Sequence, residues 1–236
     1  MMKTRLGKYA AAGAFVLTMA ATSTAGAAVL SASVGGVPDA AGMIYENFNG
    51  LSLGNAGGVT GTGIMVNFSG TAQTVQGSAS GLYASPFLSA GNGALFGDVD
   101  GPTASPYLST GNSSIELLLP GQQLYFGLLW GSVDDYNSLA FYDGYTLVGT
   151  FTGLDVDAAA HGDQGANGTF YVNIDFDTAF NRVVASSSQY AFEFDNVALS
   201  SEPQGPGGNQ VSEPASLAMI GLGLLGMGAV ARRRRS

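Results

Sequence analysis

The sequence predicts an all-β protein whose folded part, residues 28–200, is a jelly-roll-like β-sandwich. Short segments rich in β-branched and aromatic residues alternate with turns of Gly, Asn, Asp and Ser, and no segment between them has the apolar period of a helix. At least about eight short antiparallel strands in roughly 170 residues are typical of a sandwich, with an open barrel as the alternative.

Two segments show the strand pattern most clearly. In "TFYVNIDFD" (169–177) apolar and polar residues alternate, which predicts a half-buried strand. "QLYFGLLWGS" (123–132) is apolar on both faces and suits a central strand covered on both sides. Trp130 continues the apolar face of that strand, so we expect it in the core.

The remaining strands follow from turn signals. Asp143 and Gly144 separate "SLAFY" from "TLVGTF", and an Asp-Gly pair between two apolar runs predicts a tight β-hairpin. We expect further strands in "MIYENF", "GIMVNFSG", "SSIELLLP", "NRVVASSS" and "YAFEFDNVALS".

The N-terminus has the pattern of a signal peptide, residues 1–27. Lys3, Arg5 and Lys8 precede an apolar stretch, and small residues in an A-x-A arrangement end at Ala27. We expect a signal peptidase to cleave after Ala27, with an uncleaved amphipathic helix as the alternative.

The C-terminal part divides into a Pro- and Gly-rich linker, residues 201–211, and a tail, residues 212–236. Residues 215–231 carry no charge and would form one transmembrane helix of about 25 Å, close to the thickness of the bilayer core. The four arginines that follow predict a stop on the cytoplasmic side, with the domain outside. These arginines are Arg232, Arg233, Arg234 and Arg235.

The charge distribution restricts the partners of the folded part. The chain has a formal net charge of −9, and Arg182 is the only Lys or Arg between residues 28 and 210, so this part carries about −15. A nucleic acid would be repelled, whereas divalent cations or a neutral polysaccharide are compatible with such a field. The chain has no cysteine and a single histidine, His161, which argues against thiol chemistry and multi-histidine metal sites.

Calcium is the one cofactor that the acidic residues suggest. Asp98 and Asp100 stand two apart in "GDVDG", a spacing found in calcium loops. In jelly-roll carbohydrate-binding modules the first and last strands commonly lie side by side, and Glu46 and Asp195 fall in strands at those two positions. Oxygen ligands on adjacent strands suit Ca²⁺, while local turn and strand-edge hydrogen bonds are the alternative interpretation.

Exposed aromatic rings could bind a sugar by stacking, and Tyr136, Tyr142 and Tyr145 are the candidates. Hydrolysis of a glycosidic bond would require two cooperating carboxyl groups, and Asp134 and Asp135 are the nearest pair. Because adjacent residues of a strand point to opposite faces, these two would not flank one bond. We therefore expect no enzymatic activity.

The tail resembles the PEP-CTERM sorting signal of Gram-negative bacteria that make exopolysaccharide. The resemblance lies in a short motif, an apolar segment and an arginine cluster, in that order, with Ser212 in place of the first proline of the motif. It implies processing by an exosortase, transient residence in the inner membrane, and delivery to the cell surface or extracellular matrix. A plain membrane anchor is the alternative. The motif residues are Ser212, Glu213, Pro214, Ala215 and Ser216.

Residues 107–200 are similar to the common ectodomain of one family of exosortase-dependent surface proteins. "YFGLLWGSVDDYNSLAFYDGYTLVGTFTG" and "YAFEFDNVALS" carry this resemblance, which implies a fold and a destination but no activity. Our leading hypothesis is a non-enzymatic exported protein associated with extracellular polysaccharide or biofilm. The alternatives are a carbohydrate-binding module with a defined sugar site and a permanently anchored surface protein.

Overall fold

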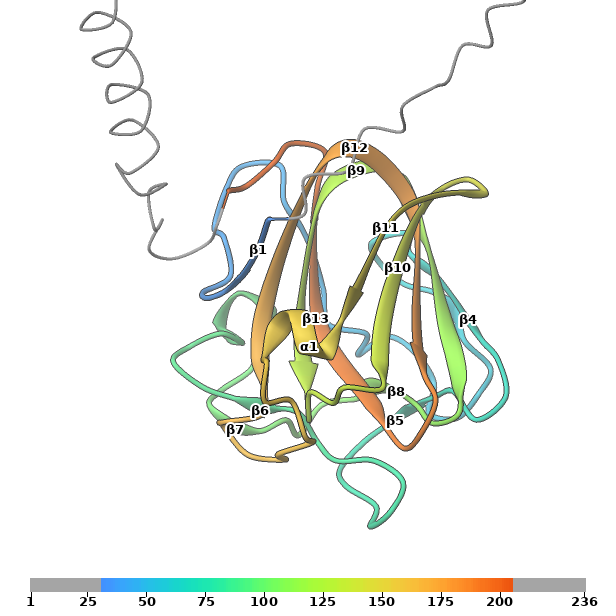
Figure 1. Ribbon diagram of the computed structural model, residues 1–236, viewed down its shortest axis with the longest axis vertical. Coiled ribbons are helices and arrows are strands. Elements are labelled where there is room, and N and C mark those ends of the chain that lie inside the picture. Colours follow the sequence, from blue (N-terminus) through green and yellow to red (C-terminus); the bar gives the residue numbers. More distant parts are fainter. Residues whose placement is uncertain (1–30, 206–236) are drawn as a thin grey trace, which may run out of the picture.

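A computed structural model describes residues 31–205 of the chain as a single β-rich domain (Figure 1). The signal peptide, the transmembrane helix and the sorting motif that the sequence predicts lie outside the described residues. The domain is built of antiparallel strands in two layers, so the predicted all-β sandwich is confirmed. Among residues 31–205, no helix is long and apolar enough to cross a membrane.

Most strands are short, and two are long. The bounds are β1 (Ser31–Val34), β2 (Ile44–Glu46), β3 (Gly58–Val59), β4 (Met65–Phe68), β5 (Gln73–Val75), β6 (Phe87–Leu88), β7 (Gly101–Pro102), β8 (Tyr107–Thr110), β9 (Ser113–Gly131), β10 (Asn137–Asp143), β11 (Thr146–Thr152), β12 (Phe170–Ser187) and β13 (Phe192–Ser200). A 3₁₀ turn, η1 (Ala94–Phe96), and one helical turn, α1 (Gly153–Val156), are the helical elements of the described residues.

The long strands β9 and β12 join the two layers. The sequence predicted two separate strands in each of these regions, but each forms one continuous strand. The register between them shifts between Asp175 and Phe180, and both strands curve over one end of the molecule (Figure 1). The first half of β9 pairs with β4 and the second half of β12 pairs with β10, whereas their other halves pair with each other. One pair of bent strands therefore contributes to both layers of the sandwich.

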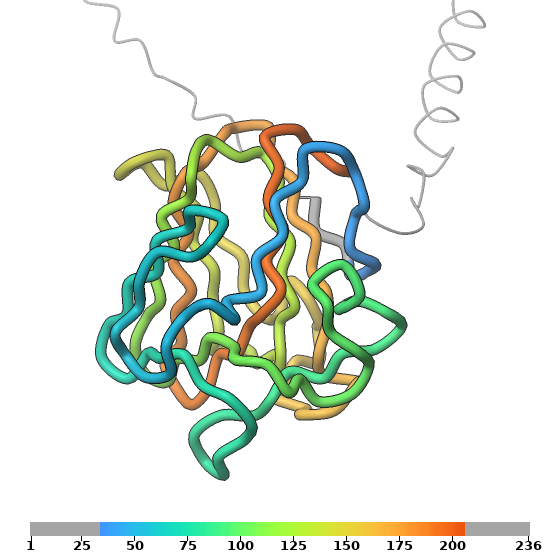
Figure 2. The backbone as a smooth tube through the Cα atoms, turned by 180° about the vertical axis from the view of Figure 1, so that it is seen from behind, coloured from blue at the N-terminus to red at the C-terminus, as the bar shows by residue number. Residues whose placement is uncertain are grey.

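Strand β13 lies in the middle of the sheet, whose order is β11-β10-β12-β9-β13-β8-β5. It pairs with β9 along one edge and with β8 and β2 along the other. Figure 2 shows β13, near the red end of the colour bar, running beside the early segment that contains β2. Glu46 faces Val197 across this pair, so the expectation that the early and late strands are neighbours is confirmed.

The main core fills the space between the layers, and a second apolar cluster covers the outer face of β9, β12 and β13. Trp130 is fully buried in the main core, as the sequence predicted. Its ring stacks on Phe192 with 4.5 Å between ring centroids. The second cluster consists of Leu88, Phe96, Tyr125, Leu129, Tyr171 and Ala198, with Val37, Met43 and Tyr45 packed against it.

This second cluster corrects one expectation. The segment 169–177 was expected to be half buried, but Tyr171 and Asn173 on its polar face are each only 1% exposed. The chain before β2 and the chain around η1 pack over this face, and Asn173 accepts a hydrogen bond from the Tyr125 hydroxyl at 2.6 Å. The alternation of apolar and polar residues therefore identified the two faces of the strand correctly, but the polar face is buried rather than exposed to solvent.

The hairpin between β10 and β11 is confirmed, but its two-residue turn lies one residue later than the predicted Asp143-Gly144 pair. Asp143 pairs with Thr146, so Gly144 and Tyr145 form the turn, and Gly144 has a φ of +58°. Glycine adopts this left-handed conformation without the steric cost that a Cβ brings.

The single tryptophan provides a test of the packing. Because Trp130 is fully buried, we expect residues 28–205 to show tryptophan emission shifted to the blue of free tryptophan and a β-rich far-UV spectrum. Both signals should be lost together on unfolding in denaturant. Solvent-exposed emission in native buffer, or helical content above about a quarter, would contradict this fold.

Candidate functional site

A polar pocket of about 430 Å³ lies at the end of the sandwich where β9 finishes and β13 begins. The volume is within the range of small-molecule sites. Its lining comes from the loop 78–83, the turn after β9, the loop around His161 and the start of β13. The residues that carry its chemistry are Tyr83, Asp134, Tyr136, His161, Tyr190 and Glu193.

Glu193 is the most buried acid of this pocket, with only 2% of its surface exposed. One carboxyl oxygen, Oε1, accepts a hydrogen bond from the Ala84 amide at 2.8 Å, and the other, Oε2, has no partner within the protein. Burial raises the pKa of Glu193 to about 8, and the charge of Asp134 adds to the rise. At neutral pH this carboxyl group therefore holds a proton for much of the time and can donate a hydrogen bond.

Asp134 is held by the turn that ends β9. Ser132 adopts a φ of +46°, and the next residue, Val133, is tied in both directions to the loop 162–168 by backbone hydrogen bonds. At Gly162 a Cβ would come within 2.7 Å of Asp134 Oδ1, so only glycine allows this approach. Burial raises the pKa of Asp134 above its ordinary value, against the opposing effect of the Tyr136 hydroxyl.

Three tyrosines add aromatic surface to the pocket. Tyr136 donates a hydrogen bond to the Tyr190 carbonyl at 3.0 Å, and Tyr190 itself is 44% exposed. Tyr83 packs edge-on against the buried Tyr107. Aromatic faces beside hydroxyl and carboxyl groups are the combination that a sugar ring needs, because its apolar face can stack while its hydroxyls form hydrogen bonds.

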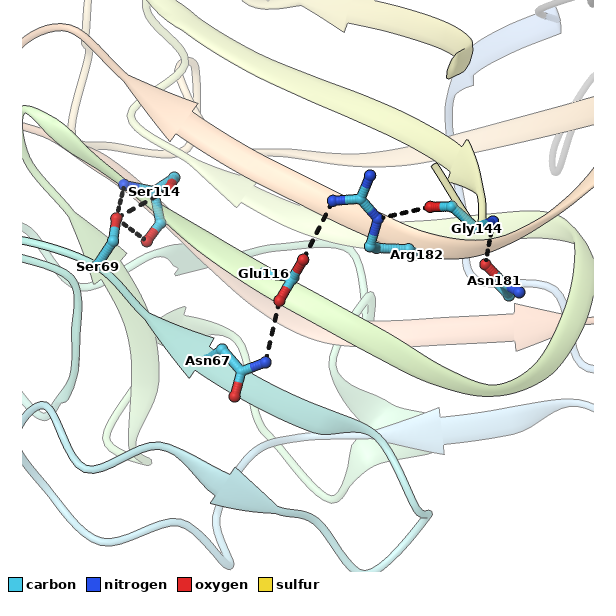
Figure 3. Close-up of polar contacts among 7 residues, drawn as sticks. All are labelled: Asn67, Ser69, Ser114, Glu116, Gly144, Asn181 and Arg182. Atoms are coloured by element: carbon cyan, nitrogen blue, oxygen red, sulfur yellow. Dashed lines mark hydrogen bonds and ion pairs between the residues drawn. The ribbon is translucent and has the colours of Figure 1, made fainter. Parts of the chain in front are cut away.

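A second hollow, of about 580 Å³, lies near the turn between β10 and β11. Figure 3 shows its polar centre, where Arg182 contacts Glu116 at 3.1 Å and donates a hydrogen bond to the Gly144 carbonyl at 3.0 Å. The Arg182 guanidinium also lies 3.9 Å from the ring centre of Tyr142. The only Lys or Arg of the described residues is thus already engaged within the protein.

The structure therefore separates the three tyrosines that the sequence grouped as ligand-binding candidates. Tyr136 lines the polar pocket, whereas Tyr145 lines the hollow at Arg182 and Tyr142 packs on Arg182 itself. Tyr142 follows Tyr136 by six positions, which span about 20 Å of extended chain, so one sugar ring cannot contact both. Tyr145 is 99% exposed at the turn.

The four acids proposed for calcium are not gathered into one group. Both carboxylate oxygens of Glu46 are engaged, Oε1 by the Phe48 amide and Oε2 by the Thr62 hydroxyl, each at 2.7 Å. Asp100 accepts a hydrogen bond from the Gly91 amide. Asp98 and Asp195 are both bonded to Asn196. Within residues 31–205 no group of three or more His, Cys, Asp or Glu side chains is placed to hold a metal ion.

Two polar residues of β13 escaped the sequence analysis as site residues, Glu193 and Asn196. Both belong to "FEFDN", in which acidic and amide residues alternate with phenylalanines. Alternation alone would place the polar side chains of this segment in solvent, but the whole of β13 is buried. A polar residue inside a fully buried central strand is the signal that would have identified them.

The fold and the tail together define a general class of protein, in which an all-β domain is followed by a short C-terminal signal. In comparisons with known proteins, the PEP-CTERM protein-sorting motif matches residues 210–235. The match covers the predicted motif, Ser212–Ser216, and the arginine cluster, Arg232–Arg235. No curated protein and no solved structure matches the chain.

The chain thus carries a PEP-CTERM sorting signal, which directs exosortase-dependent sorting to the cell surface of Gram-negative bacteria. The further resemblance of residues 107–200 to the ectodomain of one surface-protein family stays a prediction.

Glu193 should make stability depend on pH. Its pKa is raised from 4.5 in the unfolded chain to about 8 in the folded protein, so the stabilisation is complete below pH 4.5 and is lost as the pH rises toward 8. We expect the free energy of unfolding to fall by up to about 1.4 kcal/mol per pH unit in this interval from Glu193. Denaturant titrations between pH 5 and 8, with a chelator present, measure this.

Glu193→Gln should reduce the pH slope, because glutamine cannot titrate. A residual slope of the same sign should persist, since burial also raises the pKa of Asp134 and Asp175. Asp177, which is exposed and lies outside the pocket, provides the control, and Asp177→Asn should leave the slope as it is in the wild type. Equal slopes in the wild type and in Glu193→Gln would contradict the assignment.

Proposed function

We propose that this protein is a non-enzymatic component of the cell surface or extracellular matrix that associates with exopolysaccharide, as in a biofilm. The observation that carries the proposal is the sorting signal at residues 210–235, because it directs the domain to the cell surface. The resemblance of the tail to the signal of bacteria that make exopolysaccharide supports polysaccharide as the polymer that the domain would meet there. A signal peptidase would release the N-terminus first, and an exosortase would act on the tail while the precursor lies in the inner membrane.

The polar pocket supports polysaccharide as the partner. Glu193, Asp134 and the tyrosine hydroxyls supply hydrogen-bond donors and acceptors, and the exposed ring of Tyr190 supplies a surface for stacking. The described residues have no free Lys or Arg with which to attract an anionic polymer, since Arg182 is paired with Glu116. A sugar chain without charge is therefore the ligand class that fits best. This pocket also favours the second candidate, a carbohydrate-binding module with a defined sugar site.

Binding to the polysaccharide of the producing strain tests the association. Tyr136→Ala removes an aromatic ring from the polar pocket, and we expect it to weaken binding about tenfold, or about 1.4 kcal/mol. Tyr145→Ala is the matched control, because Tyr145 lies at the other hollow and is almost fully exposed. Affinity electrophoresis or calorimetry with the purified polysaccharide measures both variants.

Four results with this polysaccharide are informative. Loss for Tyr136→Ala with retention for Tyr145→Ala supports the polar pocket. The reverse pattern would place the binding site in the hollow at Arg182. Absence of binding by the wild-type protein overturns the proposed association. Release of reducing sugar from the same polysaccharide would overturn the non-enzymatic assignment.

A substitution in the tail separates sorting from simple anchoring. Glu213→Ala leaves the apolar segment and the four arginines intact, so a plain anchor would behave as in the wild type. We expect the variant to accumulate uncut in the inner membrane, whereas wild-type surface protein should lack everything from about Ser212 onward. Intact mass of the protein from each fraction measures this. Normal surface display with unchanged mass would favour the permanently anchored alternative.

A further inference from the structure

The polar pocket has a neighbour, a second hollow of about 330 Å³ that is lined by residues 54–55 and 70–73. Leu82 and Tyr190 line both spaces, so these two side chains form the border that the two hollows share. Each volume lies within the range of small-molecule sites. Together the two hollows therefore offer room for more than one sugar residue.

The border between the hollows presents apolar surface to solvent. Leu82 is 46% exposed and Tyr190 is 44% exposed. Leu82 lies in a closed turn, because the backbones of Ala79 and Tyr83 exchange hydrogen bonds of 2.9 and 3.0 Å across it. In Figure 2 this segment, which follows β5, projects as a loop from the lower end of the domain. The apolar face of a sugar ring can rest on such a border while its hydroxyls reach the hollows on either side.

The ring of Tyr190 is fixed in place by the fold. A Cβ on Gly111 would lie 2.6 Å from both Cδ1 and Cζ of this ring, so the backbone of Gly111 covers one face of the ring. The Tyr190 carbonyl accepts a hydrogen bond from the Tyr136 hydroxyl at 3.0 Å, and the Asn137 side chain donates to the next carbonyl, that of Ala191, at 3.3 Å. A ring that is fixed before binding loses little freedom when a ligand stacks on it.

The walls of the second hollow are fixed by hydrogen bonds as well. Gly54 and Thr74 exchange two backbone hydrogen bonds, each of 2.9 Å, which tie the first wall to β5. On the other wall, the Thr71 amide donates to Ser113 Oγ at 3.1 Å, and the two hydroxyl groups lie 2.9 Å apart. The hollow is therefore formed before any ligand arrives.

The side chains that line the two hollows suit an uncharged ligand. The second hollow is lined by no charged residue, and Asn55 and Gln73 supply amide groups that can both donate and accept hydrogen bonds. In the polar pocket, Oε2 of the buried Glu193 has no partner within the described residues. No Lys or Arg of residues 31–205 lines either hollow, so an anionic chain would find no opposite charge there.

We infer that the polar pocket and the second hollow form one groove, which binds several consecutive residues of an uncharged polysaccharide chain, with one sugar stacked on Tyr190. This inference rests on the proposed association with exopolysaccharide and specifies the length of chain that the site contacts. Each added sugar gains contacts until both hollows are filled. Affinity should therefore rise with the length of the chain and then become constant.

Calorimetry with sugar chains of graded length tests the groove. The protein is the mature form from the producing cells, and the ligands are fragments of that strain's purified exopolysaccharide, made by partial acid hydrolysis and separated by length. We expect the affinity to rise roughly tenfold between the shortest fragments that bind and the length that fills both hollows, from about two added hydrogen bonds.

Three variants locate this gain. Asn55→Ala combined with Gln73→Ala removes both amide side chains from the second hollow, so it should abolish most of the gain with length and leave the binding of short fragments as in the wild type. Tyr190→Ala should weaken the binding of every fragment roughly tenfold, because the ring borders both hollows. Gln76→Ala is the matched control, since Gln76 is exposed and lines neither hollow.

The outcomes separate the groove from the proposed function. A gain with length that the double variant loses and Gln76→Ala keeps supports the groove. Equal affinity for all lengths in the wild type, a full gain in the double variant, or unchanged binding by Tyr190→Ala overturns the groove and leaves the proposed association standing. Absence of binding to every fragment and to the intact polysaccharide overturns both. Should Gln73→Ala disturb β5, Asn55→Ala alone, at an exposed position, decides in the same way.

Discussion

The structure depends on a central strand, β13, that carries polar side chains into the interior. All nine residues of β13 are buried, and four of them carry polar side chains: Glu193, Asp195, Asn196 and Ser200. Removing carboxylates from water is costly unless the protein supplies hydrogen bonds, a proton or an opposite charge. The protein gives each acid one backbone hydrogen bond and leaves the other oxygen free. The polar pocket owes its buried carboxyl group to this incomplete satisfaction at Glu193.

The bent strands and the covering loops create this situation. Strand β9 pairs with β13 along its second half, and the chain around η1 covers the outer face on which Asp195 lies opposite Leu129. Glu193 and Asp195 stand two residues apart on the same side of β13. Glu193 opens into the polar pocket, whereas Asp195 lies beneath the loop that holds Asp98.

The sequence predicted those features that depend on neighbouring residues. The hairpin at Asp143 and Gly144 follows from local turn chemistry, the apolar faces of β9 and β12 follow from period-two alternation, and the sorting signal follows from its linear order of segments. The continuity of β9 through Pro120 was missed, because a proline usually ends a strand, whereas here it lies exposed at the bend. The burial of Asn173 depends on which segments cover that face of the strand, and local pattern does not contain that information. The separation of Tyr136 from Tyr142, by contrast, follows from the extended strand between them, so the sequence did contain it.

The central claim is that the polar pocket contains a buried carboxyl group, Glu193, whose pKa burial raises to about 8. Carbon-13 NMR titration of the side-chain carboxyl groups, on labelled protein spanning residues 28–205, addresses this claim most directly. We expect one glutamate carboxyl signal that titrates near pH 8 and is absent from Glu193→Gln. A Glu193 signal that titrates near 4.5 in the folded protein would contradict it.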